Sequence, residues 1–320
     1  MPAKSASAKP KPPKLTPLCE VAGLTAVETA VPTRVLLTKY KKAPATTPCP
    51  FKAKIDEVTQ PCTKDKKNKP IPVCSIYDRR DGTESVAITC PFRFLEDGTV
   101  LRQIEKDLLP ALPQGGSYKW VSELSLYTTD DEQLGRVDYV GATLDAKGEV
   151  LGLVNVEFQA VYSSGSTRLA FDTLVKAVAA NATVAWDKMR AADYPKTDFI
   201  SSWKRIKYQV LEKGSGLVHP QAQDATTRIP VTQVLVIDSW FYAKVLARAN
   251  GRLVPVGRDQ GSDLTIYSCS LVPDATTGAR RLAITSTLHT TVAHFKELAV
   301  EAKAADIPRF IRELRKKKQK

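Results

Sequence analysis

The sequence lacks several features that mark common classes of protein. It has no run of about 18 uninterrupted apolar residues, so we expect no membrane-spanning helix. Residues 1–15 are rich in Lys, Pro, Ala and Ser but contain no apolar segment of roughly 7 to 15 residues, which argues against a secretory signal. We therefore expect a protein that stays inside the cell.

The motifs of several large enzyme classes are also missing. The three histidines, His219, His289 and His294, are scattered and have no Ser or Cys nucleophile motif near them, which argues against a hydrolytic triad. No glycine-rich phosphate loop or dinucleotide fingerprint occurs, so ATP- and NAD-dependent chemistry are excluded.

The positive charge of the chain is concentrated at its ends. The net charge is +13, but residues 1–42 and 308–320 each carry +6, which leaves only +1 for the 265 residues between them. Basic tails attract nucleic acid by releasing counterions, without reading its sequence, and they also serve simply to keep a protein soluble. The charge therefore permits DNA binding without establishing it.

The 320 residues are enough for one large domain or two modest ones, and the pattern divides them into four segments. We expect a basic, largely disordered tail and lead-in at 1–42, a Pro- and Cys-rich module at 43–97, a core at 98–307 and a basic tail at 308–320. Hydrophobic periodicity in the core predicts a mixed α/β or α+β order. The expected helices are 101–109, 167–190, 201–213, 239–249 and 292–305; the expected strands are 121–127, 136–144, 149–161, 231–237, 264–271 and 281–287.

Four of the six cysteines, Cys49, Cys62, Cys74 and Cys90, fall within 42 residues. Clustered thiols in a module with little core of its own suggest a tetrahedral thiolate metal site, because disulfides are disfavoured in a reducing compartment. The intervals lack the C-x-x-C pairs of a zinc ribbon, so ordinary buried thiols remain an alternative. The repeated tripeptide Cys-Pro-Phe, at 49–51 and 90–92, favours two equivalent arms of one site.

A predicted hairpin brings carboxylates together. In the strand 149–161, Val154, Val156 and Phe158 form an apolar face, while the other face ends in polar residues that include Glu157. A simple register set by the turn at 145–148 pairs Leu144 with Glu149, so Asp138 should lie opposite Asn155, with Glu157 diagonal to it. Two carboxylates this close repel unless a cation or a proton intervenes, and Mg²⁺ suits such oxygen ligands. A solvated sheet edge is the alternative interpretation.

An Asp on one strand and Glu-x-Gln on the next resemble the active site of PD-(D/E)xK nucleases, with Gln159 where Lys is commoner. Further blocks occur in a fixed order, and together they resemble the NotI-type family of restriction endonucleases. The blocks are Cys49-Pro50-Phe51, Cys62-Thr63-Lys64, Val73-Cys74-Ser75, Cys90-Pro91 with Arg93, Ser122-Glu123-Leu124-Ser125-Leu126, Val137-Asp138-Tyr139, Val156-Glu157-Phe158-Gln159 with Gly165, and Trp203-Lys204-Arg205 leading to Tyr208-Gln209.

The resemblance implies a fold and a set of site residues. It implies a PD-(D/E)xK-type core of mixed sheet flanked by helices, preceded by a small module whose four cysteines bind structural iron or zinc. The implied catalytic residues are Glu123, Asp138, Glu157 and Gln159. Asp138 and Glu157 would hold Mg²⁺ with the carbonyl of Phe158, Glu123 would orient water or support the metal, and Gln159 would position the attacking water.

The implied function is that of a type II restriction endonuclease, which hydrolyses phosphodiester bonds of double-stranded DNA at a specific, palindromic and GC-rich site with Mg²⁺. We expect a cytoplasmic homodimer in a prokaryotic host, with a cognate DNA methyltransferase in the same system. The alternative is a metal-stapled DNA-binding protein without catalysis, in which Asp138 and Glu157 only form hydrogen bonds within the fold.

Overall fold

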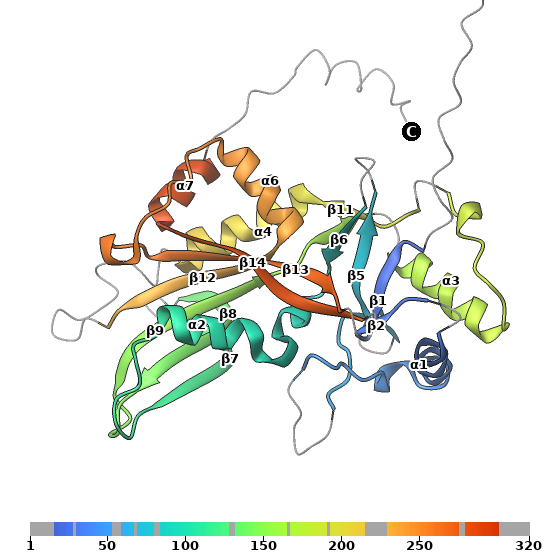
Figure 1. Cartoon of the computed structure of the whole chain (residues 1–320), viewed down its shortest axis with the longest axis horizontal. Helices are drawn as coiled ribbons and strands as arrows, with labels where there is room; N and C mark the ends of the chain where they lie inside the picture. The colour runs from blue at the N-terminus through green and yellow to red at the C-terminus, as the bar shows by residue number, and fades with distance from the viewer. Residues whose placement is uncertain are drawn as a thin grey trace, which may run out of the picture.

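Figure 1 shows the computed structural model, in which a six-stranded sheet lies beside a smaller four-stranded sheet. The structure describes residues 16–27, 30–52, 59–66, 69–79, 84–127, 132–164, 167–190, 193–214, 229–274 and 279–300. The strands are β1 (Leu18–Val21), β2 (Leu24–Thr25), β3 (Asp65–Lys66), β4 (Lys69–Pro70), β5 (Val73–Asp78), β6 (Ser85–Ile88), β7 (Ser117–Tyr127), β8 (Gln133–Leu144), β9 (Val150–Gln159), β10 (Tyr162–Ser164), β11 (Lys196–Asp198), β12 (Val231–Asp238), β13 (Leu264–Pro273) and β14 (Arg280–Thr290). The α-helices are α1 (Val31–Lys42), α2 (Thr99–Leu108), α3 (Thr167–Ala179), α4 (Phe199–Tyr208), α6 (Ser239–Ala249) and α7 (Val292–Val300); η2 (Pro91–Gly98) is a 3₁₀-helix and η4 (Gln209–Gly214) a π-helix.

The large sheet has the order β14-β13-β12-β9-β8-β7 and is mixed. Strand β8 runs antiparallel to both β7 and β9, β12 lies parallel to both β9 and β13, and β14 returns antiparallel to β13. A parallel pair needs a long crossover, and the helical segment between β9 and β12 supplies it.

Each face of the large sheet is covered by helices (Figure 1). On one face, Val100 and Ile104 of α2 pack against Val154, Val156 and Phe158 of β9, which is the apolar strand face that alternation predicts. On the other face, Trp203, Phe241 and Phe295 from α4, α6 and α7 cover β12. The prediction of a mixed sheet flanked by helices is confirmed.

The expectation of a largely disordered lead-in over 1–42 is wrong from Thr16 onward. Strand β1 pairs with β5, and α1 packs with α3 over the small sheet. Leu18 and Val21 are 0% exposed and Leu37 of α1 is 1% exposed, because the apolar residues after Pro17 follow strand and helix periods. Residues 1–15, and the predicted tail at 308–320, lie outside the described residues.

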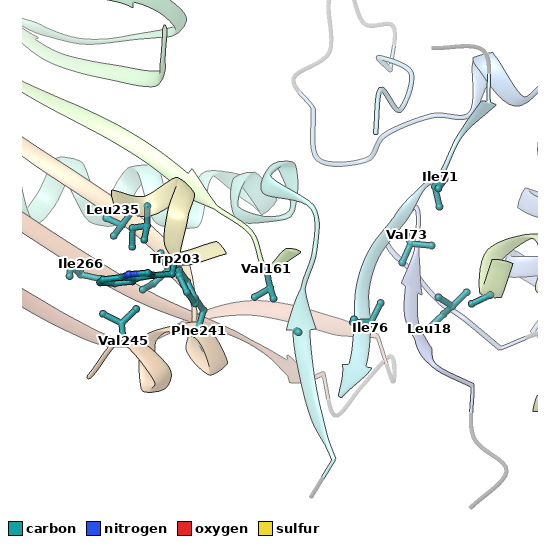
Figure 2. Close-up of a cluster of buried hydrophobic side chains, with 14 of the residues drawn as sticks. Leu18, Ile71, Val73, Ile76, Val161, Trp203, Leu235, Phe241, Val245 and Ile266 are labelled. Atoms are coloured by element: carbon teal, nitrogen blue, oxygen red, sulfur yellow. The ribbon is translucent and has the colours of Figure 1, made fainter. Parts of the chain in front are cut away.

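One continuous core runs through both sheets. Figure 2 shows it extending from Leu18 and Ile76, through Val161, to Trp203 and Phe241. Polar contacts also connect the two sheets. Buried Arg93 of η2 forms ion pairs with Glu20 of β1 and with Glu96, and it donates to the carbonyl of Arg280 on β14. The predicted four-cysteine module therefore shares its packing with the rest of the chain.

Several predicted elements are confirmed, and others end elsewhere. The expected helix 239–249 is α6, whose N-cap Asp238 accepts hydrogen bonds from the N–H groups of Trp240 and Phe241. The expected helix 167–190 is wrong beyond Ala179, because Asn181 takes a left-handed φ of 52° and residues Trp186–Lys188 form a separate 3₁₀ turn. Residues 301–305 of the last predicted helix lie outside the described residues. Within the described residues, no helix combines the length and apolar character needed to cross a membrane.

Candidate active site

The predicted catalytic strands are neighbours in the sheet, but their register differs from the expected one. Tyr139 pairs with Val156 and Val140 pairs with Asn155, which continues to Asp138 opposite Glu157. The expected pairing of Asp138 with Asn155 is therefore wrong. The register already differs by one residue at the turn, where Leu144 pairs with Val150 and not with Glu149, and a bulge between Thr143 and Leu144 shifts it by one more. The shift brings the two carboxylates directly across from each other.

Asp138 and Glu157 differ in exposure and in their partners. Glu157 is 0% exposed, whereas Asp138 is half-buried and accepts a 2.9 Å hydrogen bond from the N–H of Phe158. Burial raises the pKa of Glu157 to about 7, and the nearby charge of Asp138 adds to this effect. Burial also raises the pKa of Asp138, although the Phe158 N–H opposes the change. The ionised form of each carboxylate is therefore destabilised at its position in the folded protein.

Two residues that the sequence analysis did not select bond to Glu157 from η4. Lys213 donates to Oε1 at 2.8 Å, and Gln209 donates to Oε2 at 2.9 Å. Both side chains are buried. Gln209 belongs to the Tyr-Gln block of the family resemblance, so the sequence contains a motif that points to it. Lys213 lies outside every such block.

Gln159 lies on the same strand face as Glu157, but its amide is turned to the backbone. Its Nε2 donates to the carbonyl of Ala160, and its Oε1 is buried without a partner in the described part of the chain. The Oε1 of Gln209 is likewise buried without a partner among the described residues. Buried amide oxygens beside two carboxylates make an oxygen-rich donor set, which is the kind that Mg²⁺ prefers.

Glu123 completes the row on the third strand but is not drawn into the buried cluster. Ser122 pairs with Tyr139 and Leu124 with Val137, so Glu123 lies at the level of Asp138. Its side chain is 73% exposed and faces Arg136 across 3.9 Å. Its backbone takes a φ of 56°, which is strained for a residue with a Cβ. The structure therefore places Asp138 opposite Glu157, with Gln159 on the same strand face as Glu157 and Glu123 at the exposed end of the row.

Comparison with known protein families identifies a match. A model of the restriction endonuclease NotI family matches residues 34–242, which is more than half of the chain. The chain belongs to this family. No curated protein matches it. Membership indicates a site-specific restriction endonuclease, and the matched range includes all four predicted catalytic residues and the four clustered cysteines.

The four cysteines of this NotI-family chain line a single small cavity. Cys49, Cys62, Cys74 and Cys90 surround a space of about 10 Å³, which is roughly the room that one water-sized sphere needs. Burial raises the pKa of Cys74 well above its ordinary value and that of Cys62 to about 11. Even so, no three Cys, His, Asp or Glu side chains in the described ranges have the arrangement of a formed metal site.

The repeated Cys-Pro-Phe tripeptides pack against each other reciprocally. The first is followed by Lys52, whose Nζ lies 4.6 Å from the ring centroid of Phe92 in the second. The second is followed by Arg93, whose guanidinium lies 4.5 Å from the ring of Phe51 in the first. Each arm therefore supplies a cation to the aromatic ring of the other, which holds Cys49 and Cys90 side by side.

Proposed function

We propose that this protein is a type II restriction endonuclease that hydrolyses phosphodiester bonds in double-stranded DNA with Mg²⁺. Family membership supports the reaction class. The observation that carries the proposal is the pair Asp138 and Glu157, held opposite each other on neighbouring strands. The mixed sheet with helices on both faces supports a PD-(D/E)xK-type core.

The residues have separate roles in this proposal. Asp138 and Glu157 would hold Mg²⁺ together with the carbonyl of Phe158. When bound, the ion supplies charge neutralisation at the phosphate and lowers the pKa of a water molecule. Gln159 would orient the attacking water through its Oε1, which has no partner among the described residues. An amide oxygen accepts a hydrogen bond but takes up no proton near neutral pH. Glu123, at the exposed end of the row, would orient water next to the DNA.

We propose further that Cys49, Cys62, Cys74 and Cys90 bind one structural iron or zinc ion. Their common cavity has room for one atom-sized occupant. Burial raises the pKa of Cys62 and of Cys74, so these two thiols stay protonated unless a cation stabilises their thiolates. Four thiolates around one ion would tie together the chain segments that carry them.

The proposed substrate is a palindromic, GC-rich site cut by a homodimer, because a twofold protein places one active site on each strand of a palindrome. A cell that contains such an enzyme must protect its own DNA, so a cognate methyltransferase is expected in the same system. Sequencing the ends of digested genomic DNA would give the site and the position of cutting.

The test of the proposal is cutting of unmethylated DNA with Mg²⁺, compared with the same reaction in EDTA. Discrete fragments should appear with Mg²⁺ and be absent with the chelator. Asp138→Ala should abolish cutting and keep DNA binding, whereas Glu149→Ala, which removes an exposed carboxylate from the same hairpin, should leave cutting unchanged. A wild-type protein that shifts DNA in gels but never cuts would instead indicate the non-catalytic DNA-binding alternative. Cutting by Asp138→Ala would refute the site.

A further inference from the structure

Glu157 meets a buried lysine that comes from a helix and not from the strand. Lys213 is 7% exposed, its Nζ lies 2.8 Å from Oε1 of Glu157, and it also donates to the carbonyl of Arg136 on β8. Its ammonium is therefore held between β8 and β9, beside both carboxylates. The charge of Lys213 acts on Asp138 as well, where it opposes the effect of burial.

The local backbone explains how this lysine reaches the sheet. It belongs to the π-helix η4, whose i→i+5 hydrogen bonds widen the turn, so that Gln209 and Lys213, four residues apart, point in nearly the same direction. Gly135 on β8 has a φ of 131°, which favours glycine, and the Cε of Lys213 passes 3.4 Å from the position that a Cβ would take there. A π turn in a helix is uncommon and often marks a functional site.

We propose that Lys213 is a positioning residue of the nuclease site and supplies from η4 the ammonium group that Gln159 lacks. The inference rests on the proposed function. Lys213 fixes the Glu157 carboxylate in the orientation that faces Asp138, and Gln209 fixes its second oxygen. The charge set of the site is then two carboxylates and one ammonium, although the strand motif is Glu-x-Gln.

The first test separates positioning from simple structural support. Lys213→Gln should lower the cutting rate at least 100-fold. The same variant should bind Mn²⁺ at least threefold more tightly at pH 8.5, because it loses a cation beside the proposed metal ligands. A lysine that only supported the fold would give the opposite result, since a loosened site would bind Mn²⁺ more weakly. Lys176→Gln on α3, which removes an exposed lysine, is the control and should change neither quantity.

The second test is rescue by relocation. Residues 157 and 159 share one face of β9, so a lysine at 159 can reach Glu157 from the strand. The double variant Lys213→Gln, Gln159→Lys should therefore cut at least tenfold faster than Lys213→Gln alone. Cutting by Lys213→Gln within threefold of wild type would overturn the inference, as would loss of cutting without rescue.

The inference and the proposed function fail in different ways. A wild-type protein that does not cut DNA refutes the proposed function. Mn²⁺ affinity that is unchanged or weaker in Lys213→Gln refutes the role of Lys213, whatever the wild-type protein does with DNA.

Discussion

Replacing Asp138 by Asn should stabilise the metal-free protein near pH 8 while abolishing its cutting. The rise of the Glu157 pKa from 4.5 to about 7 corresponds to about 3 kcal/mol. Burial is the larger cause and the charge of Asp138 the second, so we expect Asp138→Asn to recover about 1 kcal/mol. The Asn side chain keeps the size of Asp and an oxygen that can accept from the Phe158 N–H.

The sign of the effect fixes its pH range. The folded-state pKa of Glu157 lies above its unfolded value, so the free-energy cost is absent below about pH 4.5, grows as the pH rises towards 7, and is complete above that. Thermal unfolding in EDTA should show Asp138→Asn more stable than wild type at pH 8, by about 1–3 °C, and no more stable at pH 5. Glu149→Gln, at an exposed position of the same hairpin, should show no such pH dependence.

Added Mg²⁺ should reverse the order of stability. An ion that binds only the folded state stabilises it by about 2.7 kcal/mol at 100 times its dissociation constant, which exceeds the expected gain of the variant. Wild type should therefore become the more stable protein in Mg²⁺, because only wild type has both carboxylates. An Asp138→Asn protein that is no more stable at pH 8, or equally stabilised at pH 5, would show that the two charges do not oppose each other.

Two further predictions concern the cysteines and Glu123. Cys74→Ser should lose its bound iron or zinc, as measured by elemental analysis, and should unfold at a lower temperature. Cys269 is buried elsewhere, in the large sheet, so Cys269→Ser should keep the metal. Equal metal content in the two variants would rule out the four-thiolate site. Glu123→Gly should raise the free energy of unfolding by about 1 kcal/mol, because glycine relieves the left-handed φ, and Glu123→Gln should not. Both Glu123 variants should cut more slowly in a timed digest, and full cutting by both would remove Glu123 from the catalytic set.

Local pattern was enough to predict the hairpin of the site but not its register. Alternation along β9 correctly separates Val154, Val156 and Phe158 from the polar face with Glu157. The bulge between Thr143 and Leu144 has no local signature, because it depends on how the strand twists within the whole sheet. The carboxylates consequently lie nearer to each other than a simple turn predicts.

The other wrong or missing predictions concern residues whose partners lie far away in the sequence. Lys213 is 56 residues from Glu157, and only the packing of η4 on the sheet brings the two side chains together. The Lys- and Pro-rich composition of the start suggests disorder over residues 16–42, but apolar positions such as Leu18 and Leu37 are buried in the core. In both cases the deciding partner lies far away in the sequence.

The charge balance of the site connects the proposed function with the role of Lys213. When both carboxylates are ionised, Asp138 and Glu157 contribute two negative charges and Lys213 one positive charge, so the buried and half-buried groups described there carry about −1. A divalent cation changes this to about +1, which complements the single negative charge of a phosphodiester. Without Lys213 the site would carry −2, so it would attract the cation more strongly but would be neutral towards phosphate once the cation is bound. Tighter Mn²⁺ binding and slower cutting are therefore two results of the same loss of charge.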